Sequence, residues 1–145
     1  MGMFDSLEIS ATGLTAERMR MDVTAENLAN AQTTRGANGG PYRRKEVVLQ
    51  EAQGASGFGA QLRSAMSGKP GGVEVAAVAE DPSPSRLVYD PGHPDADARG
   101  YVSMPNVDSV TEMVDLISAS RGYEANVTAM QASKQIFTKT LDLLR

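Results

Sequence analysis

The sequence predicts an α+β protein in which two long terminal helices, with a coiled-coil-like pattern, flank a small and mostly antiparallel β module. Two observations support this prediction. Apolar residues recur every seven positions at both ends of the 145-residue chain, a spacing typical of helices that pack along one face. The segment between them holds all seven prolines and most of the fourteen glycines. It also holds short runs of β-branched residues, which are typical of strands separated by turns.

The N-terminal repeat runs through Leu7, Leu14, Met21 and Leu28, with a second row at Phe4, Ala11, Arg18 and Ala25. It ends in the stretch AENLANAQTTRGANGG, residues 25–40, whose threonines and glycines stop a helix. Asn27 and Asn30 flank the last apolar position of the repeat. Their amides can either bond a neighbouring helix or cap this one, and the sequence does not decide between the two roles.

The C-terminal repeat runs through Leu116, Tyr123, Met130, Phe137 and Leu144, with a second row at Met113, Ser120, Val127, Lys134 and Leu141. Either Asp108 or Ser109 can cap the start of this helix. Glu112 stands at the capping-box spacing from Ser109. Gly122 is the weak point of the segment, because glycine costs about 1 kcal/mol relative to alanine inside a helix.

The middle of the chain contains four segments with strand character and one glycine-rich segment without it. The basic run Arg43, Arg44 and Lys45 lies on the first of these strands, where alternation directs Arg44 away from the other two. A solvated strand is favoured there over a contact patch. The glycine-rich segment at about 52–71 is expected to be a flexible loop. Strands are expected at residues 42–50, 72–80, 85–90 and 100–104.

These elements divide the chain into two expected domains. Residues 1–34 and 106–145 form a discontinuous helical assembly domain, and residues 35–105 form the β module with its glycine-rich loop. The chain has no tryptophan and only 5% aromatic residues, so we expect a small core, in a chain that either folds marginally or completes its core with another chain.

Composition excludes several classes of function. The net charge is −4 and the pI about 5.0, so the chain has no basic field for binding nucleic acid. No apolar run approaches the roughly 20 residues that a membrane span needs, and the start of the chain lacks the pattern of a cleaved secretory signal. The absence of cysteine removes disulfides, thiol catalysis and cysteine-based metal sites.

One polar cluster invites a metal interpretation. His93, the only histidine, lies near Asp90, Asp95 and Asp97. A calcium loop that starts at Asp95 would need glutamate at its twelfth position, where Asn106 stands, and the prolines beside His93 favour a structured turn. The sequence contains no G-x-S-x-G motif and no P-loop. We therefore expect no enzyme activity, no catalytic residue, no cofactor and no metal.

The apolar repeats predict assembly, because the middle of the chain offers no apolar surface to receive them. The helices are expected to pack on each other and on neighbouring chains. Arg18 and Lys134 lie within the repeats and favour a crowded assembly over a sealed two-chain coiled coil. The candidate assembly interface comprises Phe4, Leu7, Ala11, Leu14, Met21, Ala25, Asn27, Leu28, Asn30, Met113, Leu116, Tyr123, Val127, Met130, Phe137, Leu141 and Leu144.

Several motifs carry a family resemblance. SATGLTAERM, residues 10–19, and AENLANAQTT, residues 25–34, resemble the N-terminal signature of bacterial flagellar rod and hook proteins. Other segments are similar to the proximal-rod members of this axial family in particular. They are GGPYRR at 39–44, DPGHPDAD at 90–97, GYVSMPNV at 100–107, SRGYEANV at 120–127 and ASKQIF at 132–137. The glycine-rich segment matches no motif of the family.

The resemblance implies a structural subunit of the flagellar basal-body rod. Such subunits polymerise helically through their terminal helices, enclose the export channel and transmit torque from the motor to the hook, with the β module outside. The implied partners are copies of the chain itself, rod proteins of the FlgB, FlgF, FlgG and FliE types, and the flagellar type III export apparatus. The implied location is the rod crossing the periplasm, reached without a cleaved signal peptide.

The resemblance also implies that the terminal segments become helical on assembly. An alternative is a soluble coiled-coil adaptor or export chaperone. That function predicts a stably folded helical oligomer in isolation, whereas the rod function predicts low helicity at the ends of the free chain.

Overall fold

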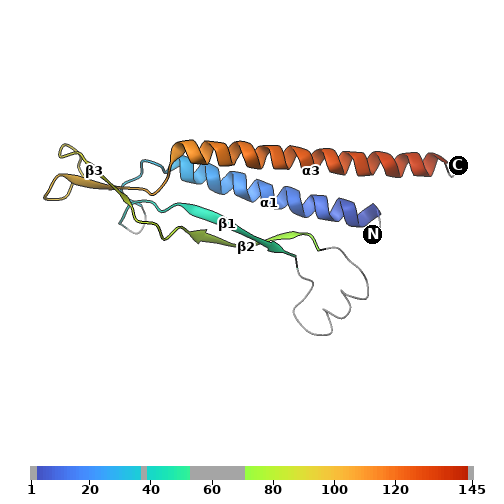
Figure 1. Cartoon of the computed structure of the whole chain (residues 1–145), viewed down its shortest axis with the longest axis horizontal. Coiled ribbons are helices and arrows are strands. Elements are labelled where there is room, and N and C mark those ends of the chain that lie inside the picture. The colour runs from blue at the N-terminus through green and yellow to red at the C-terminus, as the bar shows by residue number, and fades with distance from the viewer. Residues whose placement is uncertain (1–2, 37–38, 53–70, 144–145) are drawn as a thin grey trace, which may run out of the picture. The chain divides into compact units, whose positions relative to one another are not determined.

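The computed structural model describes residues 3–36, 39–52 and 71–143. Its elements confirm the predicted α+β fold of two long terminal helices with short hairpins between them (Figure 1). Each predicted strand is found close to its expected bounds. In chain order the elements are helix α1 (Met3–Ala29), strands β1 (Lys45–Glu51), β2 (Val73–Glu80), β3 (Arg86–Tyr89) and β4 (Tyr101–Met104), and helix α3 (Ser109–Leu143).

The contacts group the chain into two compact units. Unit 1 combines residues 1–19, 48–77 and 119–145, and unit 2 combines residues 20–47 and 78–118. Each unit therefore contains part of both helices and part of the strands. The division into a helical assembly domain and a β module stays a prediction, and the predicted loop at 52–71 lies almost wholly outside the described residues.

Helix α1 ends where side chains satisfy its last backbone groups. The Asn30 side-chain amide donates to the carbonyl oxygen of Glu26 at 2.9 Å, and the Thr33 hydroxyl donates to Asn30 Oδ1 at 3.1 Å. The backbone N–H of Thr33 bonds the Asn30 carbonyl oxygen at 3.0 Å and closes a turn. Of the two roles open to Asn30 from the sequence, it takes the capping role.

Helix α3 begins at a cap supplied by Asp108. Its Oδ1 accepts hydrogen bonds from the backbone N–H groups of Val110 at 2.8 Å and Thr111 at 3.2 Å. Asp108 is therefore the N-cap residue. The capping box expected from Ser109 and Glu112 is wrong, because the carboxylate of Glu112 turns inward to the partners described below.

In unit 1 the two helices run antiparallel and meet through small and polar side chains. The Ser6 hydroxyl donates to the Ser133 hydroxyl oxygen at 3.4 Å. A Cβ atom added at Gly13 or Gly122 would lie 3.0 Å from the facing side chain, so both glycines allow a close approach. This explains glycine in the middle of α3. The facing pairs are Ser6 with Ser133, Gly13 with Asn126, and Glu17 with Gly122.

The strands form two two-stranded sheets, β1 with β2 and β3 with β4. The β3–β4 hairpin is antiparallel, and Gly100, just before β4, has a φ of 82°. A side chain at Gly100 would collide with Tyr89, because a Cβ atom would lie 2.9 Å from its Cε2. The paired residues are Arg86 with Met104, Leu87 with Ser103, Val88 with Val102, and Tyr89 with Tyr101.

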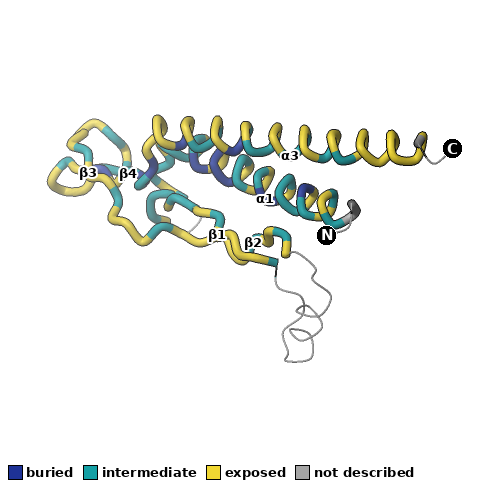
Figure 2. Tube along the Cα trace, turned by 45° about the vertical axis from the view of Figure 1, so that its right-hand side comes forward, coloured by how far each residue is buried: buried dark blue, intermediate teal, exposed yellow. Residues whose placement is uncertain are grey.

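The core is small and partly polar (Figure 2). Within the described segments, the buried apolar residues are Ala16, Val23, Val102, Pro105, Val107 and Ala119. The polar residues buried with them are Ser10, Thr24, Asn27 and Glu112. Two alanines, three valines and a proline bury little area, so large apolar side chains are left at the surface. None of the described helices is long and apolar enough to cross a membrane.

Candidate assembly surfaces and a buried polar joint

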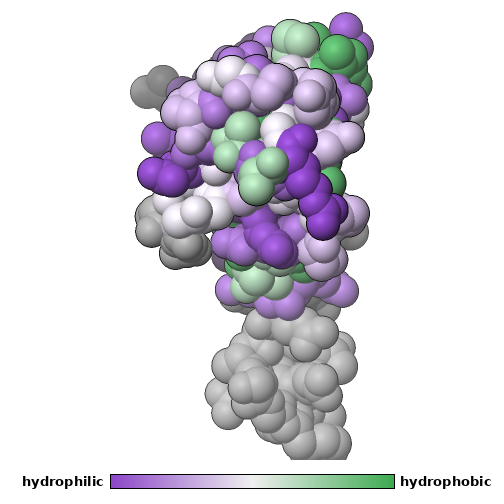
Figure 3. All heavy atoms as spheres, turned by 90° about the vertical axis from the view of Figure 1, so that its left-hand side faces the viewer, coloured by the Kyte–Doolittle hydropathy of each residue, from purple (hydrophilic) through white to green (hydrophobic). Residues whose placement is uncertain are grey.

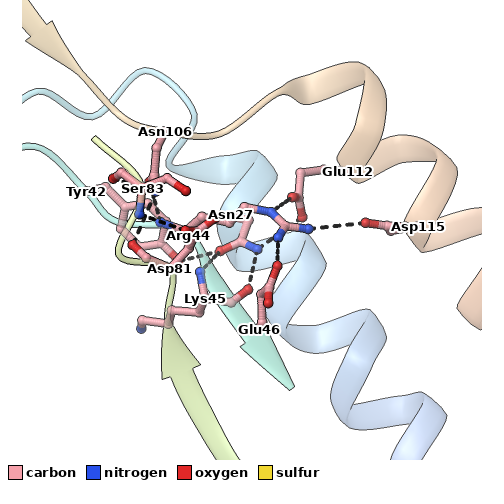
Figure 4. Close-up of polar contacts among 10 residues, drawn as sticks. All are labelled: Asn27, Tyr42, Arg44, Lys45, Glu46, Asp81, Ser83, Asn106, Glu112 and Asp115. Carbon is pink, nitrogen blue, oxygen red and sulfur yellow. Dashed lines mark hydrogen bonds and ion pairs between the residues drawn. The ribbon is translucent and has the colours of Figure 1, made fainter. Parts of the chain in front are cut away.

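A cluster of hydrogen-bonded polar side chains lies inside unit 2 (Figure 4). It joins the last turns of α1, the start of β1, the turn before β3 and the first turns of α3. We call it the polar joint. Its members are Asn27, Tyr42, Arg44, Lys45, Asn106 and Glu112.

Asn27 is the centre of the joint and is only 1% exposed. Its Nδ2 donates to the carbonyl oxygen of Lys45 at 2.9 Å and to Oε2 of Glu112 at 3.0 Å. Its Oδ1 accepts from the Tyr42 hydroxyl at 2.8 Å and from the Lys45 backbone N–H at 2.9 Å. Both donors and both acceptor positions of the amide are therefore used within the chain.

Glu112 is also 1% exposed and is paired with a cation. Arg44 Nε donates to its Oε1 at 2.5 Å, and the second carboxylate oxygen takes the bond from Asn27. The same guanidinium also pairs with Glu46 and, at 3.3 Å, with Asp115. A charge buried this deeply needs both a counter-ion and hydrogen bonds, and Glu112 has both.

The burial of the joint and its charges shift the pKa values of Arg44 and Tyr42. Although burial by itself lowers it, the pKa of Arg44 is raised overall by its hydrogen bond and charge interaction with Glu112. Burial, together with the charges of Glu26, Glu112 and Glu80, raises the pKa of Tyr42 to about 12. Tyr42 therefore remains a neutral hydrogen-bond donor to Asn27 well above neutral pH.

Asn106 ties the base of the β3–β4 hairpin into the joint. Its Oδ1 accepts from the backbone N–H of Arg44 at 2.8 Å, and its Nδ2 donates to the carbonyl oxygens of Asp81 and Ser83, each at 3.3 Å. The backbone N–H of Asp81 in turn bonds the Arg44 carbonyl oxygen at 2.8 Å. Arg44 is thus fixed by hydrogen bonds of its backbone and by ion pairs of its side chain.

Two sequence interpretations change at the joint. The solvated strand expected for the basic run is wrong for Arg44, whose side chain is 19% exposed and ion-paired. Its neighbour Arg43 is exposed, whereas Lys45, which was expected on the same side as Arg43, is half-buried and paired with Glu26. Asn27 takes the role of bonding a neighbouring helix, because it reaches Glu112 on α3. No local pattern marks Arg44 or Glu112 as partners, since they are far apart in the sequence.

The apolar positions predicted for assembly differ in their exposure. Leu7, Leu14, Met21, Leu28, Leu116, Tyr123, Val127 and Met130 are half-buried, and so is Asn30. Ala11, Ala25, Met113, Phe137 and Leu141 are exposed. Phe4 is part of α1, but its side chain lies outside the described part of the structure, as does all of Leu144.

The leucine row of α1 is half-buried because it is not the row that faces α3. In unit 1, α3 is faced by Ser6, Gly13 and Glu17. Leu7 and Leu14 each follow a facing residue, and one residue is a rotation of about 100° around the helix. Their side chains therefore flank the contact with α3 and keep part of their surface exposed.

A second apolar row on α3 was not predicted as a row. We call it the outer stripe: Val110, Met113, Val114 and Ile117, all in unit 2. Their exposed fractions run from 46% for Met113 to 67% for Val110. The i, i+3, i+4, i+7 spacing of the row was visible in the sequence. The predicted assembly residues on this helix, which lie along the repeats of Leu116 and Tyr123, include only Met113 of this set.

The β3–β4 hairpin carries another exposed apolar face. Tyr89 and Tyr101 are opposite each other, with ring centroids 5.3 Å apart in an edge-to-face arrangement, and Leu87 is beside them on the same face. All three are exposed. Figure 3, viewed from the side on which β3 is labelled in Figure 1, shows hydrophobic and hydrophilic residues interspersed.

His93 lies in the series of turns expected from its flanking prolines. Its Nδ1 accepts from the backbone N–H of Asp95 at 3.1 Å. The Asp95 carboxylate accepts from the Thr34 hydroxyl at 2.8 Å and pairs with Arg35 at 3.2 Å. These contacts fasten the turns to the segment after α1. Within the described segments, no group of three His, Cys, Asp or Glu residues is placed to hold a metal ion.

Comparison with known proteins identifies relatives that match this chain over nearly its whole length. Residues 7–37 match the family described as "Flagella basal body rod protein", and residues 98–143 match "Flagellar basal body rod FlgEFG protein C-terminal". The flagellar basal-body rod protein FlgC of Bacillus subtilis is 53% identical over 99% of both chains. The FlgC proteins of Escherichia coli and Borreliella burgdorferi are 46% and 44% identical, each over at least 98% of both chains.

The chain belongs to the FlgC family of flagellar basal-body rod proteins. This confirms the resemblance seen in the motifs. The FlgC family is structural and not enzymatic, so the function is that of a basal-body rod protein. The alternative of a free adaptor or export chaperone is therefore set aside.

The two family matches meet in the polar joint. Asn27 lies in the N-terminal match and Glu112 in the C-terminal match, whereas Arg44 lies in neither. The two segments by which FlgC proteins resemble other rod proteins are thus bonded to each other directly, and the β1 start is bonded to both.

Proposed function

We propose that this chain polymerises helically within the rod through exposed apolar surfaces of its terminal helices, so that the assembled helices enclose the export channel and transmit torque to the hook. Membership of the FlgC family supports a place in the rod. The partners in this proposal are further copies of the chain, rod proteins of the FlgB, FlgF, FlgG and FliE types, and the type III export apparatus that delivers the subunit.

The outer stripe is the main structural evidence for this proposal. In unit 2, four apolar side chains on two turns of one helix are exposed, at fractions of 46% to 67%. Single exposed apolar residues are ordinary, but a row at helical spacing is the pattern of a helix that packs on a partner. At about 25 cal/mol per Å2, covering such a row favours association.

The end of α3 supplies a second surface. The register of the facing pairs in unit 1 places Met3, the first described residue of α1, roughly level with Ile136. Beyond that level, Phe137 continues the row of Tyr123 and Met130, and Leu141 continues the second row of this helix; both are exposed. The other apolar residues of the predicted interface stay candidates for contacts with neighbouring subunits. Asn27 and Asn30, whose amides bond within the chain, support the surfaces from inside.

The test is an Ile117→Asp variant, expressed in the bacterium that encodes this chain after deletion of the native gene. Ile117 is 54% exposed, so the subunit should fold and be exported. Its carboxylate would be desolvated in an assembled apolar contact, which costs several kcal/mol. We expect loss of swimming in soft agar and loss of rods from isolated basal bodies.

Thr111→Asp is the matched control, because it adds the same charge at an exposed position of the same helix outside the row. It should swim normally. Equal swimming of both variants, at equal subunit levels, would show that the outer stripe is not an assembly surface.

A further inference from the structure

We propose that Arg44 and Glu112, with Asn27, are positioning residues for rod assembly: they hold the β3–β4 hairpin and the outer stripe of α3 at one fixed orientation within unit 2. The proposal rests on the proposed function, since it assumes that the subunit assembles through surfaces that must face their neighbours correctly. The three residues themselves are buried or largely buried.

The bonds of the joint reach both surfaces. Glu112 lies on α3 inside the span of the outer stripe, between Val110 and Met113. Asn106 lies between β4 and α3 and holds the carbonyl oxygens of Asp81 and Ser83, just before β3. Arg44 connects the two, because its side chain bonds Glu112 and its backbone N–H bonds Asn106.

Stability alone does not explain a buried ion pair at this point. Replacing such a pair by apolar residues of similar volume is often neutral or stabilising, because desolvating two charges offsets their attraction. Hydrogen bonds and ion pairs are directional, however, whereas apolar contacts tolerate sliding. Asn27 has both donors and both acceptors occupied by four specific partners, so it admits one arrangement of α1, β1 and α3.

The chain offers few other means of fixing this orientation. In the part of the chain that the structure describes, the buried apolar residues of unit 2 are three valines, Val23, Val102 and Val107, and Pro105. Such small side chains restrict the hairpin weakly. The joint therefore supplies the geometric precision that a larger core supplies in other proteins.

The decisive variant is the double substitution Arg44→Met with Glu112→Leu, which removes both charges and keeps the volume. Glu46 and Asp115 lose a partner but remain hydrated at 55% and 40% side-chain exposure. Asn27 Nδ2 loses its bond to Glu112 inside the protein, which costs about 1–3 kcal/mol and offsets the gain from removing two buried charges. We expect a urea midpoint close to that of the wild type, normal export, and loss of swimming and of complete rods. Arg43→Met is the control, since it removes the exposed arginine next to Arg44 and should swim normally.

Orientation is measured directly with spin labels. The chain has no cysteine, so Ser103→Cys on the hairpin and Thr111→Cys on α3, both exposed and both in unit 2, can be labelled without background. The distance distribution between the labels should be narrow with the joint intact. In the double variant it should broaden while the urea midpoint is unchanged.

Each outcome decides the inference. A double variant that assembles normally, or that keeps the narrow distance distribution, overturns it. A double variant that fails to fold also overturns it, because the pair would then be needed for the fold and not for orientation. If Ile117→Asp abolishes assembly while the double variant assembles, the proposed function stands and only this inference fails. If Ile117→Asp assembles normally, the proposed function itself fails.

Discussion

Asn27 shows why an asparagine, and no similar residue, suits its position. It must donate to a carbonyl oxygen and to the carboxylate of Glu112, and accept from the Tyr42 hydroxyl and the Lys45 N–H. Aspartate has the acceptors but no donor, and leucine has the shape but neither. Every buried side-chain polar atom of the described residues has a partner. The joint is therefore a satisfied network, the condition under which buried polar groups specify a structure.

Tyr42 gives the joint a measurable response to alkaline pH. Its pKa is raised to about 12, chiefly by burial, whereas a tyrosine in an unfolded chain titrates near 10. Between these values the folded state holds a proton that the unfolded state has lost. The stabilising contribution of Tyr42 is therefore complete below about pH 10 and is lost as the pH rises toward 12.

We expect the urea midpoint of the wild type to fall more steeply above pH 10 than that of Tyr42→Phe. Below pH 10 the variant should be less stable by about 1 kcal/mol, because the bond to Asn27 is lost. Unfolding curves from pH 8 to 11 measure both effects, and comparing the two proteins cancels the titration of other groups. Parallel curves above pH 10 would contradict the assignment.

Helices and strands were predicted close to their observed bounds, because turns, caps and periodicity are local signals. The row of α1 that faces α3 was not predicted, because in unit 1 it contains Ser6, Gly13 and Glu17 and is therefore not apolar. An apolar repeat identifies the most hydrophobic row of a helix, and it identifies the contact row only when the partner is apolar. The role of Glu112 was missed for a related reason: its spacing from Ser109 fitted a local cap, while its partners are distant in sequence.

Small residues in the helix contact of unit 1 predict sensitivity to volume. A Cβ atom at Gly122 would lie 3.0 Å from Cδ of Glu17, so Gly122→Leu must displace that side chain or separate the helices. Overpacking costs about 1–3 kcal/mol, which exceeds the gain of roughly 0.8–1 kcal/mol in helix propensity. We expect a lower urea midpoint by circular dichroism and reduced swimming.

Ala125→Leu is the control for this change, because Ala125 is exposed on the same helix. It should leave the urea midpoint nearly unchanged. If both substitutions have the same effect, the close approach of the helices at Gly122 is not a determinant of stability.

At the scale of the whole molecule, burial is unevenly distributed. Unit 2 holds most of the buried residues, including Asn27, Val102 and Glu112, whereas those of unit 1 are Ser10, Ala16 and Ala119 in the described segments. From Lys134 onward the described residues of α3 whose burial is assigned are all exposed. Sequence composition predicted a small core, but not which part of the chain would contain it, because that depends on the joint.

This distribution predicts how the free subunit behaves. Local opening needs little free energy where few contacts are buried, so amides in residues 124–143 of α3 should exchange with solvent faster than those in residues 109–119. A difference of about tenfold corresponds to 1.4 kcal/mol of opening free energy. In isolated basal bodies, where neighbours would cover Phe137 and Leu141, exchange in residues 124–143 should slow. Hydrogen-exchange mass spectrometry of purified subunit and of basal bodies measures both, with residues 86–104 as an internal reference. Uniform protection along α3 in the free subunit would mean that the helix is complete before assembly, and neighbours would then add contacts to a finished helix without ordering it.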